Sequence, residues 1–96
     1  MKIEWTKAAR NHLLSLDAYL YERSVVGADR VVAQIYEAVG TLSLYPFIGR
    51  TGRIKGTREL AVVSTNYIVA YRTQNEVVQI LAVMHGAQRW PRYFKD

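Results

Sequence analysis

The chain has 96 residues, of which half are hydrophobic and 22% are charged, and its formal net charge is +5 at pH 7. This length and composition are typical of one packed domain over residues 1–96, and they exclude a disordered chain. The absence of cysteine excludes disulfides, thiolate metal sites and a cysteine nucleophile, and with only two histidines we expect no metal site and no cofactor.

The first half of the chain predicts a strand followed by two helices. Residues 3–5 form a short apolar strand candidate, and Thr6 after them is a residue type that caps helix N-termini. Between Ala8 and about Glu22, apolar residues recur every three or four positions, which is one stripe of an amphipathic helix. Residues 24–27 interrupt this pattern.

The same spacing predicts a second helix from about Ala28 to Tyr45. Pro46 ends it, because proline lacks a backbone N–H and clashes with the preceding turn. Gly40 inside this helix costs roughly 1 kcal/mol relative to alanine, so either close packing requires the glycine or the helix is weak there. A helical hairpin cannot bury its apolar stripe alone, so we expect it to pack on a sheet.

The second half of the chain predicts that sheet. Residues 46–56 contain three glycines and are interpreted as an exposed loop. Three β-rich runs follow, over residues 59–63, 67–73 and 77–84. The short connections between them fit a meander of antiparallel hairpins. The order of elements predicts an α+β fold, in which a short N-terminal strand and a two-helix hairpin accompany an antiparallel sheet of three further strands.

The last predicted strand is almost wholly apolar, which is typical of a central strand or of a strand that offers one face to a partner. Strict alternation places the following side chains on one face: Val78, Ile80, Ala82 and Met84. It places the following side chains on the other face: Val77, Gln79, Leu81, Val83 and His85. We interpret the second set as a surface for a partner.

The positive charge is unevenly distributed. Residues 1–48 carry five Lys or Arg against five Asp or Glu, whereas residues 49–96 carry eight against three. No acid interrupts the four cations between Arg50 and Arg58. This asymmetry indicates either an anionic partner, such as nucleic acid or an acidic protein segment, or a solvated basic face.

Nothing in the sequence predicts export or membrane insertion. Four charged side chains within the first ten residues leave no apolar segment for a signal peptide. No apolar run approaches the ~18 residues that a membrane span needs. We therefore expect a cytoplasmic protein.

Five short motifs in series resemble the RelE/ParE superfamily of type II toxin–antitoxin toxins. They are Trp5-Thr6-x-x-Ala9, Leu44-x-Pro46-x-x-Gly49-Arg50, Gly56-Thr57-Arg58-Glu59-Leu60, Tyr67-Ile68-Val69-Ala70-Tyr71-Arg72 and His85-Gly86-Ala87-Gln88-Arg89-Trp90-Pro91. The resemblance implies a bacterial toxin that a cognate antitoxin neutralises by wrapping it with a C-terminal segment. It also implies that the pair represses its own operon and forms a hetero-oligomer.

The superfamily contains two toxic activities. RelE-like members are ribosome-dependent mRNA endonucleases, whereas ParE-like members poison DNA gyrase and are not nucleases. In the nucleases the predicted strand at Tyr67 typically carries an arginine at its second position, where this chain has Ile68. Trp90–Pro91, interpreted as a tail that folds back over the sheet, is similar to ParE-like members. The resemblance therefore favours a gyrase inhibitor that is not an enzyme, with an mRNA endonuclease and a non-toxic, antitoxin-binding regulator as alternatives.

Candidate site residues follow from these alternatives. A nuclease needs a base, an acid and cations around one phosphate, and the matching candidates are Arg58, Glu59, Arg72 and His85. Arg58 also lies beside Glu59, and an ion pair between them or a contact to a partner is favoured over catalysis. Contacts to gyrase, to DNA or to ribosomal RNA are predicted for Arg50, Arg53, Lys55, Arg58, Arg89 and Arg92. Antitoxin contacts are predicted for Arg72, Val77, Gln79, Leu81 and Val83.

Overall fold

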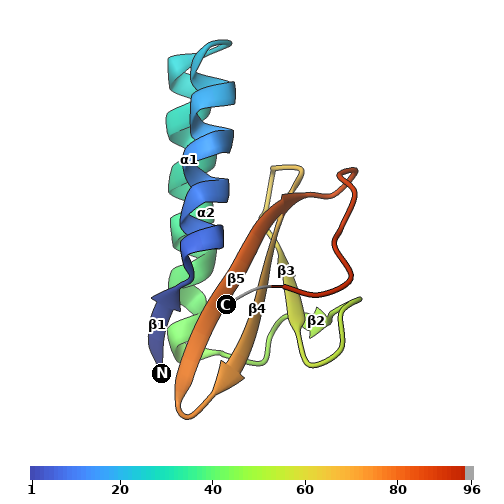
Figure 1. Ribbon diagram of the computed structural model, residues 1–96. Coiled ribbons are helices and arrows are strands. Elements are labelled where there is room, and N and C mark those ends of the chain that lie inside the picture. Colours follow the sequence, from blue (N-terminus) through green and yellow to red (C-terminus); the bar gives the residue numbers. More distant parts are fainter. Residues whose placement is uncertain (95–96) are drawn as a thin grey trace.

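The computed structural model describes residues 1–94, and in it two helices pack on one face of a five-stranded sheet (Figure 1). The elements in chain order are β1 (Lys2–Trp5), α1 (Lys7–Tyr21), α2 (Val25–Leu44), β2 (Arg50–Thr51), β3 (Arg58–Ala61), β4 (Tyr67–Gln74) and β5 (Val77–His85). This arrangement confirms the predicted α+β class. One correction concerns the predicted loop over residues 46–56, which contains the short strand β2 because its backbone pairs with the start of β3.

The strands lie in the order β1-β5-β4-β3-β2. β1 runs parallel to β5, while β2, β3, β4 and β5 form successive antiparallel pairs. The β4–β5 hairpin turns through Asn75 and Glu76, whose φ angles of 53° and 63° are those of a two-residue turn that matches the strand twist. Among residues 1–94, no helix is long and apolar enough to cross a membrane.

Side-chain caps define where both helices begin. The Ala9 N–H donates to Thr6 Oγ1 at 3.1 Å, and the Gly27 N–H donates to Ser24 Oγ at 3.0 Å. The second helix therefore starts at Val25, three residues before its predicted start, because its first turn is exposed and lies outside the apolar pattern. A Cβ atom added at Gly40 would meet no heavy atom within 4 Å beyond the neighbouring helix backbone, so close packing does not require the glycine.

The two faces of the sheet are covered differently. One face packs against the helices in a core to which both helices and strands contribute: Ala9, Leu13, Leu16, Ile35, Val39, Leu42, Val69, Tyr71, Val78, Ile80 and Val83. The opposite face carries a smaller buried cluster, Ala70, Ala82 and Met84, against which Trp90 and Phe94 pack. The chain after β5 thus folds back over the sheet, as Trp90–Pro91 predicted.

A register shift in β5 overturns the predicted alternation of its side chains. Tyr71 pairs with Ile80 while Ala70 pairs with Ala82, so Leu81 is an extra residue in the strand. The shift moves Val83 to the helix-facing core and leaves Leu81 only 2% exposed. The expected shared surface of Val77, Gln79, Leu81 and Val83 is therefore wrong, because one inserted residue reverses the facing of every later side chain.

Candidate target-binding surface

Residues 45–57, between α2 and β3, carry Arg50, Arg53 and Lys55 and are called the basic loop here. This loop approaches the sheet closely at Gly49. The Gly49 N–H donates to the Tyr71 hydroxyl at 2.9 Å, and Tyr71 is completely buried. A Cβ atom at Gly49 would lie 2.6 Å from that hydroxyl oxygen and 2.9 Å from the Glu59 carbonyl oxygen. Burial raises the pKa of Tyr71, against smaller opposing effects of the Gly49 N–H and Arg58. The hydroxyl is therefore a structural acceptor that anchors the loop.

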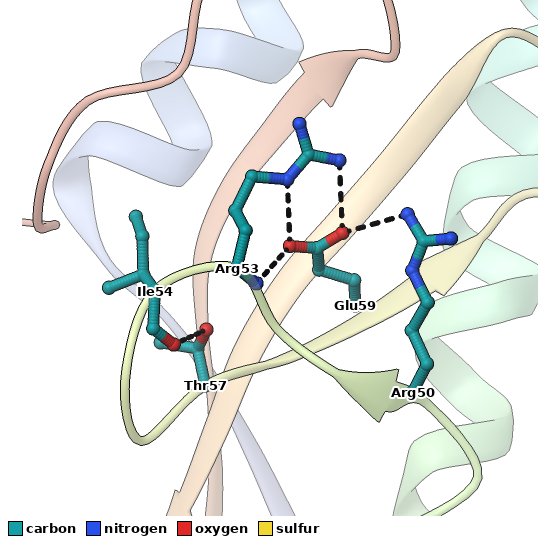
Figure 2. A network of polar contacts seen from close by, with 5 residues as sticks. All are labelled: Arg50, Arg53, Ile54, Thr57 and Glu59. Atoms are coloured by element: carbon teal, nitrogen blue, oxygen red, sulfur yellow. Dashed lines mark hydrogen bonds and ion pairs between the residues drawn. The ribbon is translucent and has the colours of Figure 1, made fainter.

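Farther along, the loop closes on itself before β3 begins. The Thr57 hydroxyl donates to the Ile54 carbonyl at 2.6 Å (Figure 2). The Gly52 N–H donates to the Thr57 carbonyl at 2.8 Å. Gly56 adopts a φ of +80°, a left-handed conformation that glycine accepts without a steric cost. These contacts give the predicted exposed loop a defined shape.

A single carboxylate organises the cations of the loop. Figure 2 shows Glu59 between Arg50 and Arg53, and its side chain is only 2% exposed. The carboxylate accepts hydrogen bonds from the Arg53 backbone N–H at 2.8 Å, from Arg53 Nε at 3.1 Å and Nη2 at 3.2 Å, and from Arg50 Nη2 at 3.0 Å. Burial by itself raises the pKa of Glu59, but the bonds from Arg53 and Arg50 outweigh it and the pKa lies below its ordinary value. Glu59 is thus an ionised acceptor rather than a proton carrier.

The same network joins the loop to the C-terminal tail. The Arg53 guanidinium carbon lies 3.6 Å from the centroid of the Trp90 ring, which is cation–π geometry. Trp90 in turn packs on Ala70, Ala82 and Met84 across the sheet. Loop and tail therefore form one continuous surface, which we call the loop–tail surface and define by Arg50, Arg53, Lys55, Glu59, Arg89, Trp90 and Arg92.

This surface is strongly cationic. It carries five Lys or Arg side chains and one carboxylate, so its net charge is 5 − 1 = +4, compared with +5 for the whole chain. Lys55, Arg89 and Arg92 are exposed and make no ion pair with another residue of the described chain. Such a surface suits phosphates or an acidic protein segment.

Arg58 does not pair with Glu59, contrary to expectation. Adjacent residues of a strand point to opposite faces, and Arg58 pairs in register with Tyr71 on the helix-facing side. Its guanidinium donates to the Phe47 and Gly49 carbonyl oxygens at 3.2 and 2.8 Å. Arg58 therefore holds the start of the loop against β3.

The other two candidate nuclease residues also lie on opposite faces. Arg72 points to the tail side, where its Nε donates to Gln79 Oε1 at 2.7 Å. His85 lies on the helix side, where its ring and that of Tyr67 are nearly perpendicular, with their centroids 5.5 Å apart. Its Nδ1 accepts the Ala87 N–H at 3.1 Å.

The four candidates therefore do not converge on one point. Glu59 and Arg72 share the tail face, whereas Arg58 and His85 share the helix face. Even on that face, Arg58 and His85 pair with opposite ends of the Tyr67–Tyr71 segment, which corresponds to roughly 13 Å along the strand. Groups that act on one phosphate must lie within hydrogen-bond reach of it. Among residues 1–94 no group of three or more His, Asp or Glu side chains could hold a metal ion either.

The structure also places side chains together that our sequence reasoning missed. His12, Tyr19 and Arg30 line a cleft on the helix side of the sheet, together with Tyr67 and His85. His12, Ser15 and Tyr19 recur at spacings of three and four, so a second helix face beside the apolar stripe was readable from the sequence. The residues that complete the cleft come from distant strands, and only folding brings them there.

The chain is similar to known toxins along nearly its whole length. The family model described as the ParE toxin of type II toxin–antitoxin systems, parDE, matches residues 3–90. The chain is 45% identical over 91 residues to "Putative toxin Y4kP" of Sinorhizobium fredii, covering 95% of this chain and 94% of that protein. It is 29% identical over 87 residues to "Toxin RelE2" of Caulobacter vibrioides, covering 91% and 97%.

A solved structure shares the fold. The structure titled "Chromosomal ParDE TA system from P. aeruginosa" superimposes with a TM-score of 0.78 at 24% sequence identity, covering 88% of this chain and 95% of that one. Strand, helical hairpin and meander are therefore arranged alike in the two proteins. Taken with the family match, this shows that the chain belongs to the ParE toxin family and is the toxin of a type II toxin–antitoxin system, a class of protein whose partner is an antitoxin.

Proposed function

We propose that this toxin inhibits DNA gyrase, and that it contacts gyrase or gyrase-bound DNA through the loop–tail surface. The observation that carries the proposal is the separation of Arg58 and His85 from Glu59 and Arg72 on opposite faces of the sheet. Cleavage of RNA through its 2′-hydroxyl needs a base, an acid and a cation around one phosphate. Inhibition by binding needs only a complementary surface.

The contacts of the individual side chains support the same conclusion. Glu59 is occupied by four hydrogen bonds from Arg50 and Arg53, and Arg58 by two backbone carbonyls. These groups already serve the fold of the loop. Lys55, Arg89 and Arg92, in contrast, extend into solvent from a surface that is held in shape from beneath. That division of roles is typical of an interface, where anchored residues position the contacting ones.

The proposal is tested first in cells that express the chain without its antitoxin. Incorporation of thymidine and of methionine is followed in the same culture after induction. We expect DNA synthesis to fail first and protein synthesis to decline later, and we expect the purified chain to inhibit supercoiling by gyrase. Rapid loss of translation while replication continues would overturn the proposal in favour of an mRNA endonuclease. Normal growth with both labels unaffected would favour a non-toxic, antitoxin-binding regulator.

A pair of matched double variants tests the surface itself. Arg89→Ala with Arg92→Ala removes two exposed cations from the tail, and Lys7→Ala with Arg10→Ala removes two exposed cations from α1. Both change the net charge equally. We expect the tail variant to need at least tenfold more protein for half-maximal inhibition of supercoiling, and the α1 variant to behave like the unmodified chain. Equal effects of the two variants would show that net charge, and not this surface, governs inhibition.

A further inference from the structure

The C-terminal tail brings an exposed aromatic ring to the cations of the loop–tail surface. Tyr93 is 67% exposed, whereas Trp90 before it and Phe94 after it are partly buried and pack on the sheet. The Trp90 ring also lies against the Arg53 guanidinium. Trp90 and Phe94 therefore fix the tail to the sheet, and the ring of Tyr93 remains available to a partner.

The charges around this ring favour an anionic partner. Lys55, Arg89 and Arg92 are exposed and pair with no carboxylate in the part of the chain that the structure describes. The carboxylate of the surface belongs to Glu59, whose side chain is only 2% exposed and is held by two arginines of the basic loop. An anionic ligand at the loop–tail surface therefore meets several cations, and the one acid of that surface is already neutralised.

The combination of charge and aromatic ring distinguishes between two kinds of anionic ligand. An acidic protein segment offers carboxylates to the cations, but its acidity gives Tyr93 nothing to bind. Unpaired nucleotides satisfy both features, because their phosphates contact cations while a base stacks on an aromatic side chain. Nucleic acid therefore fits this surface better than an acidic protein segment.

The architecture of the surface indicates which form of nucleic acid it fits. Reading a duplex in its major groove requires a helix or a two-stranded ribbon that enters the groove. Both helices pack on the opposite face of the sheet, and β2, at the loop, is only two residues long (Figure 1). Within a duplex each base is also covered by its neighbours, so Tyr93 would find no free base to stack on. A single strand leaves its bases accessible.

We propose that the loop–tail surface binds unpaired DNA directly, with Tyr93 stacked on a base and with Lys55, Arg89 and Arg92 against phosphates. This inference deepens the proposed function and rests on it for the source of the DNA. Supercoiling cannot change unless DNA is cut, and a cut exposes bases that the duplex covers. DNA within the gyrase complex, and not the gyrase protein, is then the ligand of this surface. Because stacking and phosphate contacts accept any base, we expect little dependence on DNA sequence.

The test is the affinity of the purified chain for a fluorescein-labelled single strand of DNA, measured by fluorescence anisotropy. A length of roughly 12 nucleotides lies within the site sizes of single-strand-binding proteins. A duplex and an RNA of the same sequence are measured beside it. Tyr93→Leu removes the flat ring and Tyr93→Phe keeps it, while Tyr21→Leu is the control that removes a 55% exposed ring from α1. Thermal unfolding followed by circular dichroism checks that each variant is folded.

We expect the unmodified chain to bind the single strand more tightly than the duplex, and RNA no more tightly than DNA. Tyr93→Leu should weaken binding of the single strand at least fivefold, because the variant loses the stacking of one base. Tyr93→Phe and Tyr21→Leu should each change the affinity less than twofold.

The salt dependence of binding tests the cations. For a single strand, the logarithm of the binding constant falls with the logarithm of the salt concentration by about 0.7 per phosphate contact. Three cations without ion pairs therefore predict a slope of about −2. Arg89→Ala with Arg92→Ala should reduce it to about −0.7, whereas Lys7→Ala with Arg10→Ala, on α1, should leave it unchanged.

Several results would overturn this inference. They are the absence of binding at low salt, equal affinities of Tyr93→Leu and Tyr93→Phe, and tighter binding of the duplex or of RNA. Displacement of the DNA by a glutamate polymer as effectively as by unlabelled DNA of the same total charge would show that an acidic protein segment fits the surface instead. Inhibition of supercoiling is measured separately on the same protein. Inhibition without DNA binding would refute only this inference, whereas DNA binding without inhibition would refute the proposed function.

Discussion

Neutralising the carboxylate of Glu59 should loosen both the basic loop and the C-terminal tail. The substitution Glu59→Gln keeps the size of the side chain but replaces one acceptor oxygen with an NH₂ group, which faces arginine donors. The side chains of Arg50 and Arg53 are 64% and 41% exposed, so both cations regain water when the carboxylate is lost. Hydrogen bonds to charged groups contribute about 1.5–3 kcal/mol each, and this exposure reduces the net loss. We expect the free energy of unfolding to fall by about 2 kcal/mol, which lowers the Tm of a domain of this size by roughly 8–16 °C.

Two measurements check this expectation. Thermal unfolding followed by circular dichroism at pH 7 reports the change in stability, and Glu37→Gln, at an exposed position of α2, is the control that should stay within about 0.5 kcal/mol. Trp90 fluorescence, isolated in a Trp5→Phe background, reports the stacking of Arg53 on the indole ring. We expect its emission to shift in Glu59→Gln. A variant as stable as the unmodified chain, or one with unchanged Trp90 emission, would refute the coupling of loop to tail through this carboxylate.

The sign of the pH dependence follows from the lowered pKa of Glu59. A carboxylate with a lower pKa in the folded state binds protons more weakly there than in the unfolded chain. The contribution of Glu59 to stability is therefore complete above the ordinary glutamate pKa, and it is lost as the pH falls through the lower pKa that Glu59 has in the folded state. Because the side chain of Glu59→Gln does not titrate, the difference in stability between variant and unmodified chain should shrink in acid. A constant difference between pH 7 and pH 3 would contradict this reasoning.

Three further substitutions test the packing and the cleft. Gly40→Ala should raise the free energy of unfolding by roughly 1 kcal/mol in urea titrations, because nothing lies within 4 Å of the added methyl group; destabilisation would show a packing role for the glycine. Gly49→Ala should lower it by about 2–4 kcal/mol, since the new methyl group would overlap the buried Tyr71 hydroxyl and break its bond, and a neutral effect would mean that the loop moves aside. Burial lowers the pKa of His12, so the unmodified chain should lose stability as the pH falls from the ordinary histidine value of 6.5 toward the lower folded value. His12→Asn keeps an acceptor for the Val83 N–H without titrating and should lose less over that range, which urea unfolding at pH 7.5 and 5.5 would detect.

Much of the fold was readable from local patterns. The period of the apolar residues defined both helices and Thr6 marked the start of the first, because helix formation and capping depend on neighbours within one or two turns. The short connections predicted the antiparallel meander for a similar reason, since a hairpin constrains strands that are adjacent in sequence. Trp90–Pro91 also indicated the returning tail. The basic residues of the loop and the tail could be named in advance because charge is a property of composition.

What those residues do was decided only by tertiary structure. The sequence by itself determined the class of fold, the helices, the meander and the concentration of charge in the second half. It could not show that Glu59 binds Arg50 and Arg53 rather than its neighbour Arg58. The pleat places adjacent side chains on opposite faces, and only the folded loop brings Arg50 and Arg53 next to Glu59. Nor could it show the extra residue at Leu81, since a bulge depends on how two strands register. The cleft joins helix residues to strand ends far away in the sequence, so it exists only once the hairpin lies on the sheet.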